Sequence, residues 1–179
     1  MAELSSNRVW LGRAFYLLVA LLLIFLSLLP MQTTPRAIAP PDLLLAVTLG
    51  WTVRRPEVVP ITFVAAIFLM TDLLFQRPPG LYAGLVVILT EVLRHRSKRL
   101  RNFTFTTEWL SVGLGMIALM LGYRILLMVA MVPAPPLGLT LIQLLLTILT
   151  YPIVIMVSHF AFGVSRPAPG EVDSLGHRL

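Results

Sequence analysis

Residues 71–80 read T-D-L-L-F-Q-R-P-P-G, and this stretch places the strongest structural constraint on the chain. Asp72 stands inside an apolar run, and Arg77 and a Pro79-Gly80 turn follow where that run stops. A carboxylate among Leu and Phe is costly in a hydrocarbon environment, so it needs a partner or serves a function. The meaning of Asp72 therefore depends on whether the chain spans a membrane and on which charge lies opposite.

The composition is that of a membrane protein. Of the 179 residues, 58% are hydrophobic and only 12% are charged, and the mean hydropathy is +0.89. Soluble domains are about half apolar and about a quarter charged. The net charge of +6 does not predict nucleic-acid binding, because the basic residues cluster in short gaps between apolar runs. The absence of cysteine excludes disulfides and thiolate chemistry.

Six apolar runs predict an all-α membrane protein, a compact bundle of six transmembrane helices. The predicted spans are residues 14–31, 42–53, 58–75, 80–93, 109–132 and 137–162, in one domain of residues 1–165 followed by a polar tail of residues 166–179. The second span, at about 18 Å, and the fourth are short for a full crossing. The first run is interpreted as an uncleaved helix rather than a signal peptide, because further spans follow it.

Charge placement predicts the orientation. With the amino terminus inside, eleven Lys and Arg residues lie in the cytoplasm, only Arg36 and Arg77 lie outside, and Arg124 lies within the membrane. The positive-inside rule therefore places both termini in the cytoplasm. The dense basic block of residues 94–101 is expected to be a cytoplasmic loop that contacts anionic lipid headgroups.

Asp72 and Arg124 have the same predicted depth. Asp72 lies 14 residues into a helix counted from residue 58, at about 21 Å, and Arg124 lies 15 residues beyond Trp109, at about 22 Å. Opposite charges at one level predict a buried ion pair, because each charge alone is costly. Arg77 is the rival partner for Asp72. A polar cavity for a ligand, or the helix of a partner protein, would use the same residues.

The other acidic residues have simpler interpretations. Asp42 follows Pro40-Pro41 and is expected to cap the second helix, where a carboxylate meets the positive end of the helix dipole. Glu91 is expected to pair with Arg94 or His95 at helical spacing. Glu108, like the other acids near the cytoplasmic boundary, is expected to be reached by headgroup water.

Small and aromatic residues give weaker signals. Gly80 and Gly84 stand four apart on one predicted face, which favours close helix packing beside the Pro79 turn. Aromatic residues near span ends are expected to be interfacial anchors. The residues in this class are Trp10, Tyr16, Trp51 and Tyr82.

No catalytic, metal or cofactor motif is present. The sequence lacks a nucleophile elbow, a zinc-protease helix, a phosphate loop and a dinucleotide fingerprint. The three histidines are too scattered for a metal site. The nearest approach to an active site is Asp72 and Arg124 together with Asp42. An intramembrane enzyme that acts on lipid-linked precursors rests on this constellation alone and is the weakest of the possible functions. We therefore predict that the protein is not an enzyme and needs no cofactor.

The pattern of segments resembles a known family. Pro41-Asp42-Leu43-Leu44-Leu45 opens a short helix that has Trp51 near its end, and a later span finishes Asp72-Leu73-Leu74 before Pro79-Gly80. This combination, with six closely spaced apolar runs, resembles the rod shape-determining protein MreD family over nearly the whole chain. The resemblance implies a fold similar to the substrate-binding subunits of energy-coupling-factor transporters.

The resemblance also implies a function. It implies a non-enzymatic subunit of the cell-elongation machinery in the bacterial inner membrane. Its partners would be MreC and, through MreC, the MreB cytoskeleton and the transglycosylase–transpeptidase pair that builds lateral wall. The alternative is a transporter or its ligand-binding subunit, because short helices often border substrate sites. An outward cavity near Asp72 is the feature on which that alternative depends.

Overall fold

The computed structural model describes residues 2–29, 39–101 and 104–162 and contains six helices in those ranges. They are α1 (Ala2–Leu28), α2 (Leu43–Arg54), α3 (Ile61–Leu74), α4 (Leu81–Arg101), α5 (Phe105–Val129) and α6 (Leu137–Phe162). Each of the six predicted spans coincides with one helix, so the all-helical fold is confirmed.

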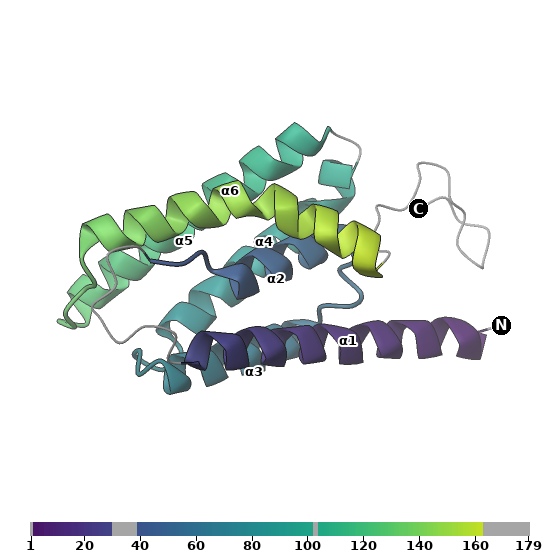
Figure 1. The fold of residues 1–179 in the computed structure, drawn as a ribbon, viewed down its shortest axis with the longest axis horizontal. Coiled ribbons are helices and arrows are strands. Elements are labelled where there is room, and N and C mark those ends of the chain that lie inside the picture. The colour runs from purple at the N-terminus through teal and green to yellow at the C-terminus, as the bar shows by residue number, and fades with distance from the viewer. Residues whose placement is uncertain (1, 30–38, 102–103, 163–179) are drawn as a thin grey trace.

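Consecutive helices run in opposite directions, so the bundle has two ends. We name them the Asp42 end, where α2 begins after Asp42, and the Arg54 end, where α2 finishes. At the Arg54 end, Arg13 of α1 donates to the Glu57 carbonyl, and Arg54 meets Glu108 of α5. Figure 1 shows α1 and α3 along one side, α5 and α6 along the other, and α2 and α4 between them.

Helix α2 is the centre of the bundle. All eleven residues after Leu43 are buried, because α2 packs against α1, α4 and α6. A helix that is apolar all round is expected to be enclosed by others. Its polar groups find partners inside the protein: Trp51 Nε1 donates to Ser158 Oγ of α6 at 3.0 Å, and the Tyr16 and Thr48 hydroxyls are 3.0 Å apart.

The interfacial role predicted for three aromatic residues is therefore wrong. Trp51, Tyr16 and Tyr82 are buried in the core, whereas Trp10 is 60% exposed. The hydrogen bond of each buried polar ring removes the need for interfacial water. Position near the end of a span did not distinguish these three buried residues from interfacial anchors, because it does not show which side of a helix faces the core.

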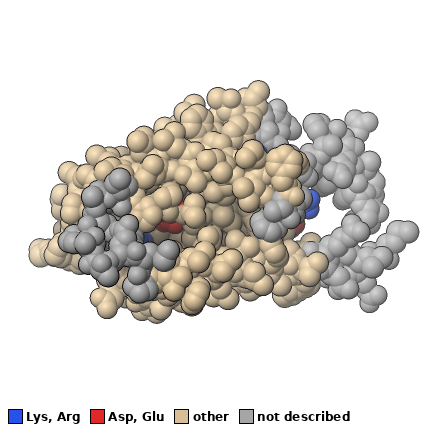
Figure 2. Space-filling model, in the orientation of Figure 1, with Lys and Arg blue, Asp and Glu red and all other residues tan. Residues whose placement is uncertain are grey.

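The outer surface is that of a membrane protein. Residues Val9–Leu28, Phe105–Val129 and Leu137–Phe160 are each long and apolar enough to cross a membrane, and α2 and α3 are shorter apolar helices. Figure 2 shows a face on which acidic and basic atoms are visible only in small areas, and the rest of the described surface carries neither. Leu11, Phe25 and Ile125 are more than half exposed. Such an apolar exterior fits a lipid environment and not water.

Neighbouring helices approach closely at Gly50 and Gly115. A Cβ at Gly50 of α2 would lie 2.5 Å from Ile155 Cδ1 of α6, and one at Gly115 would lie 2.7 Å from Leu89 Cδ1. A Cβ at Gly80 or Gly84 would meet nothing within 4 Å, so the packing predicted for that pair is wrong within the described structure. Gly80 instead supplies a positive φ of 84° next to Pro79, just before α4 begins.

The basic block is helical, which corrects the predicted loop. Helix α4 continues to Arg101, eight residues beyond Leu93. Arg94 fixes its position, because its guanidinium donates to the carbonyls of Pro56, at 2.9 Å, and Val59, at 2.5 Å, in the α2–α3 connection. The predicted pairing of Arg94 with Glu91 is confirmed at 2.8 Å.

Candidate functional site

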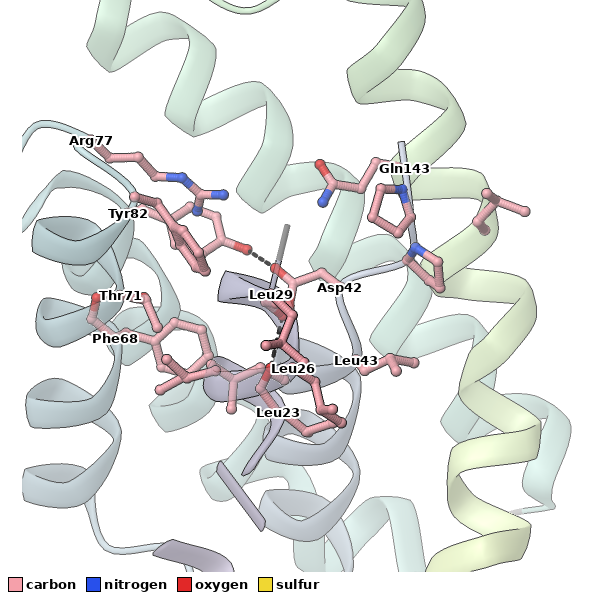
Figure 3. Close-up of a pocket in the computed structure, with 17 residues that line it drawn as sticks. Leu23, Leu26, Leu29, Asp42, Leu43, Phe68, Thr71, Arg77, Tyr82 and Gln143 are labelled. Carbon is pink, nitrogen blue, oxygen red and sulfur yellow. Dashed lines mark hydrogen bonds between the residues drawn. The ribbon is translucent and has the colours of Figure 1, made fainter. Parts of the chain in front are cut away.

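A cavity of about 850 Å³ lies at the Asp42 end between α1, α2, α3 and α6. Its apolar lining includes Leu23, Leu26, Leu43 and Phe68, and its polar lining includes Asp42, Arg77, Tyr82 and Gln143 (Figure 3). Ligand sites in proteins are commonly cavities of about 300–1,000 Å³ with apolar walls and a few polar groups. This cavity is the candidate functional site.

Asp42 ties three helices together at the cavity. Its Oδ1 accepts the Leu45 N–H at 2.9 Å, which confirms the predicted cap of α2. Its Oδ2 accepts the Tyr82 hydroxyl of α4 at 2.9 Å, drawn as a dashed line in Figure 3. Its own N–H donates to Thr147 Oγ1 of α6 at 2.9 Å. Both carboxylate oxygens are thus occupied, so Asp42 orients Tyr82 as well as capping α2.

Arg77 provides the positive charge at the cavity. Its Cζ lies 4.8 Å from the centre of the Tyr82 ring and 5.5 Å from that of Phe75. In Figure 3 the guanidinium lies beside Tyr82 and across the cavity from Gln143. Among the described residues no acid lies within ion-pair distance of Arg77, including its predicted rival partner Asp72. The guanidinium therefore offers free donors to an occupant of the cavity.

Asp72 caps α4, a helix that begins nine residues after it. The side chain is buried, and its Oδ2 accepts the backbone N–H groups of Gly80, at 3.0 Å, and Ala83, at 3.1 Å. These N–H groups belong to the unpaired first turn of α4, where a negative charge also meets the positive end of the dipole. Its Oδ1 has no hydrogen-bond partner in the described part of the chain.

The predicted Asp72–Arg124 ion pair is wrong. Arg124 Nη1 donates instead to the Pro135 carbonyl at 3.1 Å and to Thr140 Oγ1 at 3.2 Å, on the approach to α6. The predicted depth of Arg124 agrees with the structure, because the ring of the neighbouring Tyr123 lies 5.4 Å from the ring of Tyr82 at the Asp42 end. Successive helix residues are turned by about 100°, so Tyr123 faces α4 and Arg124 faces α6.

A buried ion pair in the described part of the chain lies at the Arg54 end. Arg54 Nε is 3.1 Å from Glu108 Oε1, Arg54 Nη2 is 3.4 Å from Oε2, and the Tyr151 hydroxyl donates to Oε1 at 2.9 Å. Glu108 is fully buried, which corrects its predicted contact with headgroup water. One signal was available in the sequence, since Arg54 and Glu108 are opposite charges at the same predicted boundary.

The predicted site residues thus fall into separate groups. The structure gathers Asp42, Arg77 and Tyr82 around the cavity, and it places Asp72 next to them under the first turn of α4. Arg124 belongs to the α5–α6 connection. No three His, Cys, Asp or Glu side chains within the described ranges are arranged to hold a metal ion. The chemistry that the cavity offers is binding, through Arg77 and Gln143 over apolar walls.

Comparison of the chain with protein-family models, curated proteins and solved structures found no match.

Proposed function

We propose that this chain is a non-enzymatic integral membrane subunit of the bacterial cell-elongation complex, with six spans and both termini in the cytoplasm. In this role it docks MreC and helps to couple the MreB cytoskeleton to peptidoglycan synthesis and cell shape. The proposal draws on the resemblance of Pro41-Asp42-Leu43-Leu44-Leu45 and Asp72-Leu73-Leu74 with Pro79-Gly80 to the MreD family. On the predicted topology, the Asp42 end faces outward.

The cavity at the Asp42 end is the observation that carries the proposal. Leu26 and Leu43, which line it, are 50% and 38% exposed, so the cavity that contains Arg77 also has uncovered apolar surface. An apolar groove with one free cation suits an amphipathic protein segment, which supplies apolar side chains for the walls and a carbonyl or carboxylate for Arg77. A partner's membrane helix and the residues that continue from it have this character.

Filling the cavity tests this proposal. Gln143→Trp places a large ring in the cavity from α6, and we expect it to lower the recovery of co-purified MreC several-fold. Leu145→Trp is the matched control, because Leu145 is on the same helix, is 60% exposed and does not line the cavity. The measurement is the ratio of the two proteins after purification in mild detergent from cells with native expression.

Two results would count against docking at this site. The first is equal recovery of MreC with both tryptophan variants. The second is no association between the unaltered chain and MreC. Size-exclusion profiles and unfolding temperatures of the two variants show whether each remains folded, so that a loss of MreC reports binding.

A ligand-binding transport subunit is the second candidate, and the same cavity favours it. That function depends on an outward cavity near Asp72. Thr71 and Arg77, on either side of Asp72 in the sequence, line the cavity at the Asp42 end, which faces outward on the predicted topology. Its volume of about 850 Å³ is within the usual range for small-molecule sites. Short helices such as α2 and α3 also commonly border transport sites.

The two functions differ in what occupies the cavity. A photo-crosslinking amino acid at position 143 is expected to capture MreC if the cavity docks a protein partner. A transport subunit would instead retain a small molecule, which mass spectrometry of the extracted protein detects. Loss of that molecule in Arg77→Gln, with no crosslink to protein, would favour transport.

A further inference from the structure

The last two turns of α4 form a second charged feature, at the opposite end from the cavity. Beyond Leu93 the helix continues through Arg94-His95-Arg96-Ser97-Lys98-Arg99-Leu100-Arg101, which we call the basic extension. Its seven residues after Arg94 rise by about 10 Å. A basic loop would have no fixed direction, whereas the helical backbone gives the basic extension a direction and a defined first residue.

That starting point is the edge of the apolar bundle. Arg94 donates to the carbonyls of Pro56 and Val59, so it lies level with the connection between α2 and α3. The apolar helices turn at this level, because α2 finishes at Arg54 and α3 begins at Ile61. The basic extension therefore begins where a surrounding bilayer would end.

The first turn of the basic extension has both buried and exposed side chains. Leu93 and Ser97 are buried, and His95 and Arg96 are exposed. The two exposed side chains are thus at the start of the basic extension, on the turn that follows Arg94. Arg13 of α1 donates to the Glu57 carbonyl of the same connection, which brings a further cation to this end.

Three acids described at this end already have basic partners. Glu57 is paired with Arg55, Glu91 with Arg94 and Glu108 with Arg54. The sequence contains no Asp or Glu between Glu91 and Glu108, a stretch that holds Arg96, Lys98, Arg99 and Arg101. The stretch between these two acids therefore carries a net positive charge.

We propose that the basic extension binds the headgroups of anionic phospholipids at the surface of the membrane that holds the bundle. Its charge is complementary to theirs, and Arg94 sets it at headgroup depth. Basic residues beside a membrane span strengthen the attraction to anionic lipid by about fivefold each. The inference is independent of the proposed function and requires only that the bundle lies in a bilayer.

Lipid competition in micelles tests the proposal. The full chain is purified in neutral micelles of maltoside detergent and phosphatidylcholine, and bound phosphatidylglycerol is measured against phosphatidylcholine by native mass spectrometry. We expect a preference for phosphatidylglycerol that weakens as salt increases. In the triple variant Arg96→Gln, Lys98→Gln, Arg99→Gln we expect that preference to fall by at least fivefold.

Two further variants separate this site from net charge and from misfolding. The triple variant Arg36→Gln, Arg166→Gln, Arg178→Gln loses the same charge elsewhere and should keep the preference. Arg96→Lys with Arg99→Lys conserves charge and should keep it as well. Equal loss in both triple variants, or no preference in the unaltered chain, would overturn the proposal. Binding of a short RNA in place of phosphatidylglycerol would also overturn it.

Discussion

Glu108 is the acidic residue whose surroundings matter most for stability. It is fully buried, and its carboxylate meets the Arg54 guanidinium and the Tyr151 hydroxyl. A buried ion pair does not necessarily stabilise a protein relative to apolar residues, but the loss of one partner leaves an uncompensated charge. The network therefore makes α2, α5 and α6 dependent on one another at the Arg54 end.

Glu108→Ala is expected to lower the free energy of unfolding by about 3–5 kcal/mol, because Arg54 is left buried without its carboxylate. The double variant Arg54→Met, Glu108→Leu should lose less unfolding free energy than Glu108→Ala alone. Denaturant unfolding in detergent measures both. Glu57→Ala is the control, since its side chain is 44% exposed and its pair contributes at most about 1 kcal/mol. A double variant less stable than Glu108→Ala would contradict this account.

Asp72 acts on α4 and not on Arg124, and this difference is measurable. Asp72→Ala removes the acceptor of the Gly80 and Ala83 N–H groups and is expected to cost about 0.5–2 kcal/mol of stability. Asp72→Asn keeps an oxygen acceptor and should lose less. Adding Arg124→Gln should not restore the lost stability. A coupling energy above about 1 kcal/mol between positions 72 and 124 would revive the ion pair.

At the scale of elements, α2 is short because it does not have to meet lipid along its length. Its 12 residues are enclosed by α1, α4 and α6, and Gly50 lets α6 approach closely. The surrounding helices α1, α5 and α6 are the ones with spans of 20 or more residues. Helix α3 is also short, at 14 residues, although it lies along one side of the bundle, so enclosure explains the length of α2 and not that of every helix.

Substitution of two glycines tests this arrangement of helices. Gly50→Leu forces side-chain atoms into Ile155 and is expected to lower the free energy of unfolding by about 1–3 kcal/mol. Gly84→Leu enters open space on α4 and should leave stability unchanged or raise it by up to about 1 kcal/mol. Thermal unfolding of the two variants provides the measurement. A larger loss at position 84 than at position 50 would contradict the described packing.

At the scale of the whole molecule, the cysteine-free sequence allows the proposed orientation to be tested directly. Single-cysteine variants at Arg36 and Ala134 should react with an impermeant maleimide added to intact spheroplasts. A variant at Arg96 should react only after the membrane is opened. These outcomes follow from the excess of Lys and Arg on one side. Labelling of position 96 from outside would show the opposite orientation, with the cavity facing the cytoplasm.

The sequence by itself determined the helices, because apolar run length and helix caps are local properties. Each of the six predicted spans overlaps one helix, Asp42 caps α2 as expected, and Glu91 pairs with Arg94. The common level of Asp72 and Arg124 also followed from the rise per residue. The boundaries were less accurate where a helix continues past the apolar run, as α4 does through its basic residues.

Only the tertiary structure decided which of these charges meet. Each residue turns a helix by about 100°, so an error of one position moves a side chain to another neighbour. Tyr123 therefore lies near Tyr82, while Arg124 reaches Thr140. The Glu108 network and the cavity beside Arg77 depend in the same way on how the helices pack against one another, which no single segment encodes.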